Sequence, residues 1–136
     1  MSPKPTPLEE NPEAFYARFQ AHALHAHLFP EPWGSPVLEV LVQGHILYAF
    51  DRGAPPAPTG PVRILLHGVA REVKPLEREP FVERQGSAYR LGGPFHPLGE
   101  GFYLLESPVP VVVHADQPLP ERAEVLLWPP LMLFRE

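Results

Sequence analysis

Prolines divide this chain into short segments. Twenty-one of the 136 residues are proline, and most of them lie between the apolar runs instead of inside them. Proline has no backbone N–H to donate, so it is excluded from the interior of helices and of central strands. Each pair of flanking prolines therefore marks a short element and the turn that ends it. Most of these elements alternate apolar and polar residues, which predicts β-strands.

The composition is that of a folded protein, with 44% hydrophobic and 20% charged residues. The length fits a single domain, which we expect to span residues 11–136 after a polar, proline-rich arm at residues 1–10. No apolar run is long enough to cross a membrane, which predicts a soluble cytoplasmic protein. Arginine is far more frequent than lysine, which favours a thermophilic source.

Cysteine is absent, and so are the common catalytic motifs. A metal would therefore have to be bound by His, Asp or Glu. The chain has no glycine-rich phosphate loop, no G-x-S-x-G elbow and no H-E-x-x-H helix. We therefore expect no cofactor.

The segment after Asn11 has the signals of a helix start. Asn11 suits the N-cap and Pro12 suits the first helical position. The predicted helix runs from about Pro12 to Leu28. At about 100° per residue, Phe15 and Phe19 lie on one side of it. We expect the helix to pack on the rest of the domain through these two rings.

The clearest strand signal is the alternation across residues 37–50. Fourteen residues would span roughly 45 Å, so we expect this strand to bend at Gly44. A second strand over 62–73 with Gly68 at its midpoint, a hairpin turn at Gln85-Gly86 and a loop over 92–99 follow. The apolar residues predicted to share one side of the first strand are Leu38, Val40, Val42, Ile46, Tyr48 and Phe50.

These signals predict an all-β, mainly antiparallel protein with one N-terminal helix. A long first strand coiled at a glycine is typical of small closed barrels. We therefore expect an OB-like β-barrel or a coiled sandwich of six or seven strands. No internal repeat is visible in the sequence.

Two groups of histidines are candidate sites. On the predicted helix, His22 and His25 are about 60° apart and would share a metal ion if other side chains completed the site. Surface histidines without a ligand are the simpler interpretation. His67 and His114 each end an apolar run, and Asp116 follows. A His–Asp pair at a barrel mouth would support acid–base catalysis in a hydrolase or a metal-dependent enzyme.

Basic and aromatic residues interleave between residues 63 and 90. Such a sheet face holds single-stranded nucleic acid by stacking and phosphate contacts, although glutamates in the same stretch would also pair with the arginines. The net charge of −5 opposes phosphate binding unless the cations share one face. The candidate nucleic-acid-binding residues are Arg63, Arg71, Lys74, Arg84, Tyr89 and Arg90.

The apolar segment 126–134 contains two prolines, so it either closes the core or contacts a second subunit in a homodimer. The preferred function is a non-enzymatic binding or interaction module, for single-stranded nucleic acid or for a protein, that works through residues 63–98. The alternative is the enzyme that uses His67, His114 and Asp116.

Overall fold

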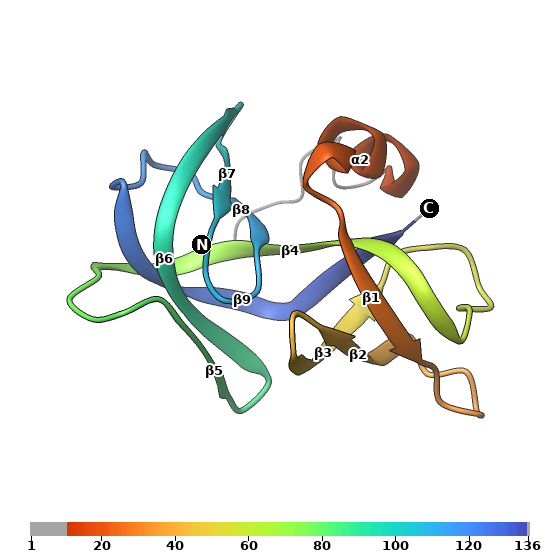
Figure 1. Ribbon diagram of the computed structural model, residues 1–136. Coiled ribbons are helices and arrows are strands. Elements are labelled where there is room, and N and C mark those ends of the chain that lie inside the picture. Colours follow the sequence, from red (N-terminus) through yellow and green to blue (C-terminus); the bar gives the residue numbers. More distant parts are fainter. Residues whose placement is uncertain (1–10, 136) are drawn as a thin grey trace. The chain divides into compact units, whose positions relative to one another are not determined.

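The structure, a computed structural model, describes residues 11–135, without the side chains of residues 128–130. The expected arm at residues 1–10 lies outside the described residues. The described part of the chain is mostly β-strand and has one short α-helix (Figure 1). No helix within it is long and apolar enough to span a membrane.

One helical segment precedes nine strands in the described residues. The helical segment consists of α2 (Pro12–Phe19) and a single 3-10 turn (Gln20–His22). The strands are β1 (Leu24–Phe29), β2 (Val37–Val42), β3 (His45–Asp51), β4 (Gly60–Pro75), β5 (Phe81–Gln85), β6 (Ala88–Gly99), β7 (Phe102–Leu105), β8 (Val111–His114) and β9 (Arg122–Arg135).

The chain divides into two compact units, and the two long strands β4 and β9 contribute to both. Among the described residues, unit 1 consists of residues 11–66 and 132–135, and unit 2 consists of residues 67–131. The expectation of a single domain over 11–136 is not decided by this division and stays a prediction.

Unit 1 is a closed barrel of five strands. β1, β2 and β3 are antiparallel neighbours, and the first part of β4 pairs antiparallel with β1. The last part of β9 pairs parallel with β3 and follows it in the strand order, next to β4. The helix α2 packs in this unit through its phenylalanines, as expected: the Phe15 ring stacks on Phe134 at 4.1 Å and meets Phe19 edge-on at 4.9 Å.

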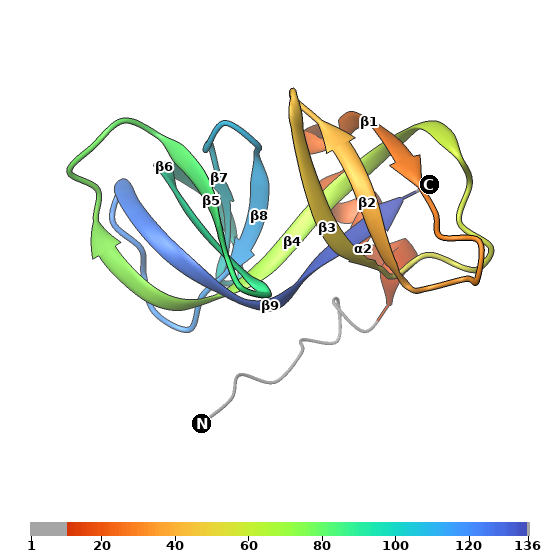
Figure 2. The ribbon, with the colours of Figure 1, turned by 90° about the horizontal axis from the view of Figure 1, so that it is seen from below.

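Unit 2 repeats this strand order. β6, β7 and β8 are antiparallel neighbours, the first part of β9 pairs antiparallel with β6, and the last part of β4 pairs parallel with β8. β5 adds a hairpin to β6. Each unit thus takes one strand from the start of one long strand and another from the end of the other: the start of β4 and the end of β9 in unit 1, and the start of β9 and the end of β4 in unit 2 (Figure 2).

The prediction of a mainly antiparallel β-protein is confirmed, but the predicted six or seven strands are too few, and the sheet is mixed instead of purely antiparallel. The described residues form nine strands, and the pairs β3–β9 and β4–β8 are parallel. The parallel pairs arise because the closing strand of each barrel comes from a distant part of the chain. Such a crossover leaves no local pattern in the sequence.

The helix predicted over 12–28 begins where expected but ends nine residues early, at Phe19. Its N-cap is confirmed, since Asn11 Oδ1 accepts a hydrogen bond from the Ala14 N–H. Residues 24–29 form β1, in which Ala26 and Leu28 are buried. Pairing with both β2 and β4 outweighs the helical preference of this segment.

The single bent strand predicted over 37–50 is instead a hairpin of β2 and β3. Gln43 and Gly44 have φ of 50° and 76°, the two positive values that a two-residue type I′ turn requires. Val42 and His45 close the turn. Two residues in the turn reverse the chain, so Ile46 and Tyr48 do not share the core side with Leu38 and Val40.

The loop predicted over 92–99 lies within β6. Its glycines are sites of close packing: a Cβ at Gly93 would lie 2.5 Å from the Glu106 carbonyl oxygen, and one at Gly92 would lie 2.7 Å from the Phe81 ring. A glycine inside a strand often marks such an approach of other groups to the backbone. The hairpin predicted at Gln85-Gly86 is present between β5 and β6 with its turn one residue later, since Gln85 pairs with Ala88 and Gly86-Ser87 form the turn.

Candidate functional site

The outward side of β1, β2 and β3 in unit 1 carries most of the exposed large apolar side chains described. Inward residues of these strands, such as Leu28, Val40 and Leu47, are buried in the barrel. The residues between them face outward, and the ladder places them in rows. We call the surface formed by Phe29, Val37, Leu41, Ile46 and Tyr48 the β1–β3 face.

One row of this face places two aromatic rings on either side of a carboxylate. Glu39 of β2 lies opposite Phe29 of β1 and opposite Tyr48 of β3. Strands lie about 4.8 Å apart, so the Cα atoms of Phe29 and Tyr48 are roughly 10 Å apart. The Tyr48 hydroxyl donates a hydrogen bond of 3.3 Å to Glu39 Oε1, which orients its ring beside the carboxylate.

The next row consists of two aliphatic side chains and one imidazole. Leu41 lies opposite both His27 and Ile46. The Ile46 side chain is 61% exposed, the highest value for an aliphatic side chain on the face. The His27 ring stacks on Phe29 with 4.8 Å between ring centroids, so the two rows are in contact on β1.

Basic groups lie along the β1 and β4 side of the face. His25 of β1 pairs with Arg63 of β4, and its neighbour on the same side of the strand is His27. An imidazole and a guanidinium both offer N–H donors to an anionic oxygen. The face thus combines exposed rings, aliphatic side chains and a border of nitrogen donors.

The sequence-predicted nucleic-acid residues are divided between the two units. Arg63 borders the β1–β3 face in unit 1, whereas the other five residues belong to unit 2. Within the β5–β6 ladder, Arg84 lies opposite Tyr89 and Glu83 lies opposite Arg90. Because neighbouring strand residues face opposite ways, Arg84 and Arg90 are on different sides of this ladder. Tyr89 is only 4% exposed and offers no ring for stacking.

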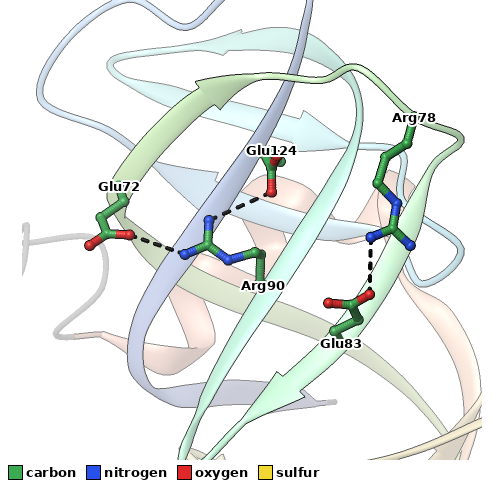
Figure 3. Close-up of polar contacts among 5 residues, drawn as sticks. All are labelled: Glu72, Arg78, Glu83, Arg90 and Glu124. Atoms are coloured by element: carbon green, nitrogen blue, oxygen red, sulfur yellow. Dashed lines mark hydrogen bonds and ion pairs between the residues drawn. The ribbon is translucent and has the colours of Figure 1, made fainter.

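Two arginines of unit 2, Arg78 and Arg90, form ion pairs with glutamates (Figure 3). Arg90 lies between Glu72 of β4, at 3.1 Å, and Glu124 of β9, at 3.6 Å. Arg78 pairs with Glu83 at 3.1 Å, and its guanidinium lies over the Phe81 ring. Arg71, Lys74 and Arg84 are exposed. The glutamate pairing considered from the sequence is thus observed for Arg90.

The candidate catalytic residues occupy unit 2. His67 is fully buried, and its Nδ1 lies 2.7 Å from the Val112 carbonyl oxygen. The His114 ring packs against Phe102 at 4.8 Å. Asp116 is exposed and lines a separate pocket with Arg71. A buried imidazole that contacts a backbone carbonyl is typical of a core histidine, since substrate cannot reach it.

The candidate metal ligands are separated by the change from helix to strand. His22 is in the 3-10 turn and His25 is on β1, so the helical spacing that suggested a shared ion does not apply. Within residues 11–135, no group of three or more His, Asp or Glu side chains is arranged to bind a metal ion.

The C-terminal segment contributes to the core. Leu127, Leu131, Leu133 and Phe134 are all buried, and Met132 is half-buried. The side chains of residues 128–130 lie outside the described part. A homodimer through residues 126–134 stays a prediction.

Sequence reasoning missed the β1–β3 face because it merged β2 and β3 into one strand. The signal was present at Gln43-Gly44, a polar residue followed by glycine between two alternating runs. Comparison of the chain with protein-family models, with curated proteins and with solved structures found no match.

Proposed function

We propose that this protein is a non-enzymatic binding module that holds single-stranded nucleic acid on the β1–β3 face of unit 1. One observation carries the proposal: three adjacent strands expose aromatic and aliphatic side chains in paired rows. The buried core of unit 1 does not need these side chains, because the alternate residues of the same strands fill it. Large apolar side chains gathered at the surface usually mark a binding site.

The strand order of unit 1 supports an OB-like assignment. The order β1-β2-β3-β9-β4, closed by pairing of β4 with β1, is that of a five-stranded Greek-key barrel. OB barrels bind oligonucleotides on the face of their second and third strands. In unit 1 these strands are β2 and β3, which carry Leu41, Ile46 and Tyr48.

The charge distribution favours unit 1 over unit 2 as the site of a polyanion. Unit 2 has six basic and nine acidic side chains, so phosphates are repelled from it. The described residues of unit 1 have equal numbers of each, four arginines and four carboxylates. These are Arg18, Arg52, Arg63 and Arg135, with Glu13, Glu31, Glu39 and Asp51.

Stacking dominates the binding that this face supports. Bases stack on Phe29 and Tyr48, and phosphates accept hydrogen bonds from Arg63, His25 and His27. With one guanidinium on the border, few counterions are released, so the affinity falls only weakly with salt. This separates the proposed mode from binding to a basic groove.

Fluorescence anisotropy with a labelled single-stranded oligonucleotide of about 15 nucleotides tests the proposal. We expect Phe29→Ala and Tyr48→Ala each to weaken binding roughly fivefold to a hundredfold, because one stacked base contributes about 1–3 kcal/mol. Val73→Ala is the matched control, since Val73 is an equally exposed apolar residue of unit 2. It should leave the affinity unchanged.

Three results would overturn the proposal. The first is no binding at low salt. The second is a loss of affinity in Lys74→Ala and Arg84→Ala that equals the loss in Phe29→Ala, which would move the site to unit 2. The third is a dimer, seen by light scattering, that Leu41→Asp dissociates, since a second copy of the chain would then cover the face.

A further inference from the structure

Unit 1 has a pocket that adjoins the β1–β3 face. It has a volume of about 720 Å³ and lies between the loop over residues 30–36 and the loop over residues 51–59. Pro30 follows Phe29 directly and Pro36 precedes Val37 directly, and Phe29 and Val37 both belong to the face. The pocket lining therefore begins one residue beyond the face at both places, within unit 1.

The walls of the pocket are mostly apolar, and each of the two loops contains a local hydrogen bond. Proline rings dominate the walls, together with Leu38. A backbone hydrogen bond of 3.0 Å from the Gly34 N–H to the Glu31 carbonyl oxygen closes a turn in the first loop. The Gly53 N–H donates to Asp51 Oδ1 and fixes the start of the second loop. Pockets of this size, apolar with few polar groups, suit a flat heterocycle, and a preformed pocket loses little entropy on binding.

The two carboxylates that line the pocket are not equivalent. Asp51 accepts two hydrogen bonds of 3.0 Å from Arg135 and is 7% exposed, so it is committed to that ion pair. Glu31 lies in the loop next to the face and is half-buried. A carboxylate there accepts a hydrogen bond from an amino group and repels a carbonyl oxygen.

We infer that this pocket receives a base of the bound strand that carries an exocyclic amino group, represented by cytosine in the test below, with Glu31 as the acceptor for that amino group. The inference rests on the proposed function and adds base preference to it. Cytosine and thymine are pyrimidines of similar size, but cytosine presents the N4 amino donor where thymine presents the O4 acceptor. Charge complementarity with Glu31 therefore distinguishes them, whereas stacking does not.

Binding of oligo(dC) and oligo(dT) of equal length to the full chain tests the inference. We expect oligo(dC) to bind roughly fivefold to a hundredfold more tightly, as for a single specific base contact of about 1–3 kcal/mol. Glu31→Ala should abolish the preference by weakening oligo(dC) alone. Glu31→Gln should bind both oligonucleotides alike, since an amide offers both a donor and an acceptor. Glu79→Ala, with the same change of charge in unit 2, should keep the preference.

The outcomes separate the inference from the proposed function. If neither oligonucleotide binds, the inference and the proposed function are both wrong. If both bind equally to the wild type, or if the preference persists in Glu31→Ala, the cytosine pocket is wrong while nucleic-acid binding stands.

Trp33 gives a second readout, because it lies in the same loop and is 77% exposed. Unlabelled oligo(dC) should change its emission more than oligo(dT), and Trp33→Phe should remove this difference.

Discussion

Asp51 and Arg135 form a buried bidentate ion pair that ties the end of β3 to the end of β9 in unit 1. Both hydrogen bonds measure 3.0 Å, and the side chains are 7% and 8% exposed. Arg135 Nη2 also donates to the Ala54 carbonyl oxygen. The two residues are 84 positions apart in the chain. Their pairing secures the parallel β3–β9 contact that closes the barrel.

Removal of one partner of this ion pair should destabilise the protein strongly. We expect Asp51→Ala to lower the free energy of unfolding by about 3 kcal/mol, because it leaves the Arg135 guanidinium buried without its counter-charge. Urea denaturation followed by circular dichroism measures the loss. Arg78→Ala is the matched control: its ion pair with Glu83 is exposed and should contribute less than about 1 kcal/mol. Equal losses in the two variants would contradict this prediction.

The protein should unfold in one cooperative transition. β4 and β9 each supply a strand to both units, so unfolding of either unit removes a strand from the other. Calorimetry should give a single peak whose calorimetric and van't Hoff enthalpies agree. Two separated peaks would show that the units are independent domains and would reject the single-domain expectation.

The outward residues of the β1–β3 face should contribute little to stability. We expect Ile46→Thr, which keeps a β-branched side chain, to change the free energy of unfolding by less than about 0.5 kcal/mol. Leu47→Ala, at the neighbouring buried position, should cost about 2–5 kcal/mol. Chemical denaturation of both variants checks the contrast. A large loss in Ile46→Thr would mean that the face is packed and not available for a ligand.

Replacing a glycine whose backbone is tightly packed against other atoms should lower stability more than replacing a glycine in an open turn. A Cβ at Gly93 would lie 2.5 Å from the Glu106 carbonyl oxygen, a backbone atom that cannot move aside easily. Gly86 has open space around it but a φ of +64°. We expect Gly86→Ala to cost about 1 kcal/mol through backbone strain, and Gly93→Ala to cost more. Thermal melts of the two variants show which one loses more stability. A larger loss in Gly86→Ala than in Gly93→Ala would refute the packing role of Gly93.

Much of the local structure was predictable because its causes are local. Asn11 and Pro12 mark a helix start wherever they precede a suitable segment, and the alternation of β2 and β3 follows from the pleat. The end of the helix was not predictable, because Leu24–Phe29 becomes a strand only when β2 and β4 are present to pair with it. The candidate residues of unit 2 shared a stretch of sequence but not a surface, since neighbours on a strand face opposite ways.

The sequence by itself determined that this is a β-protein with one N-terminal helix, since proline spacing and apolar alternation act within a few residues. Only the tertiary structure decided that the chain forms a repeated five-strand arrangement, because β4 and β9 find partners far away in the chain. It also decided that Ile46 and Tyr48 face outward, because a two-residue turn at Gln43-Gly44 reverses β3 against β2. Because side chains alternate along a strand, a shift of one residue in the strand register decides whether an apolar side chain joins the core or the surface.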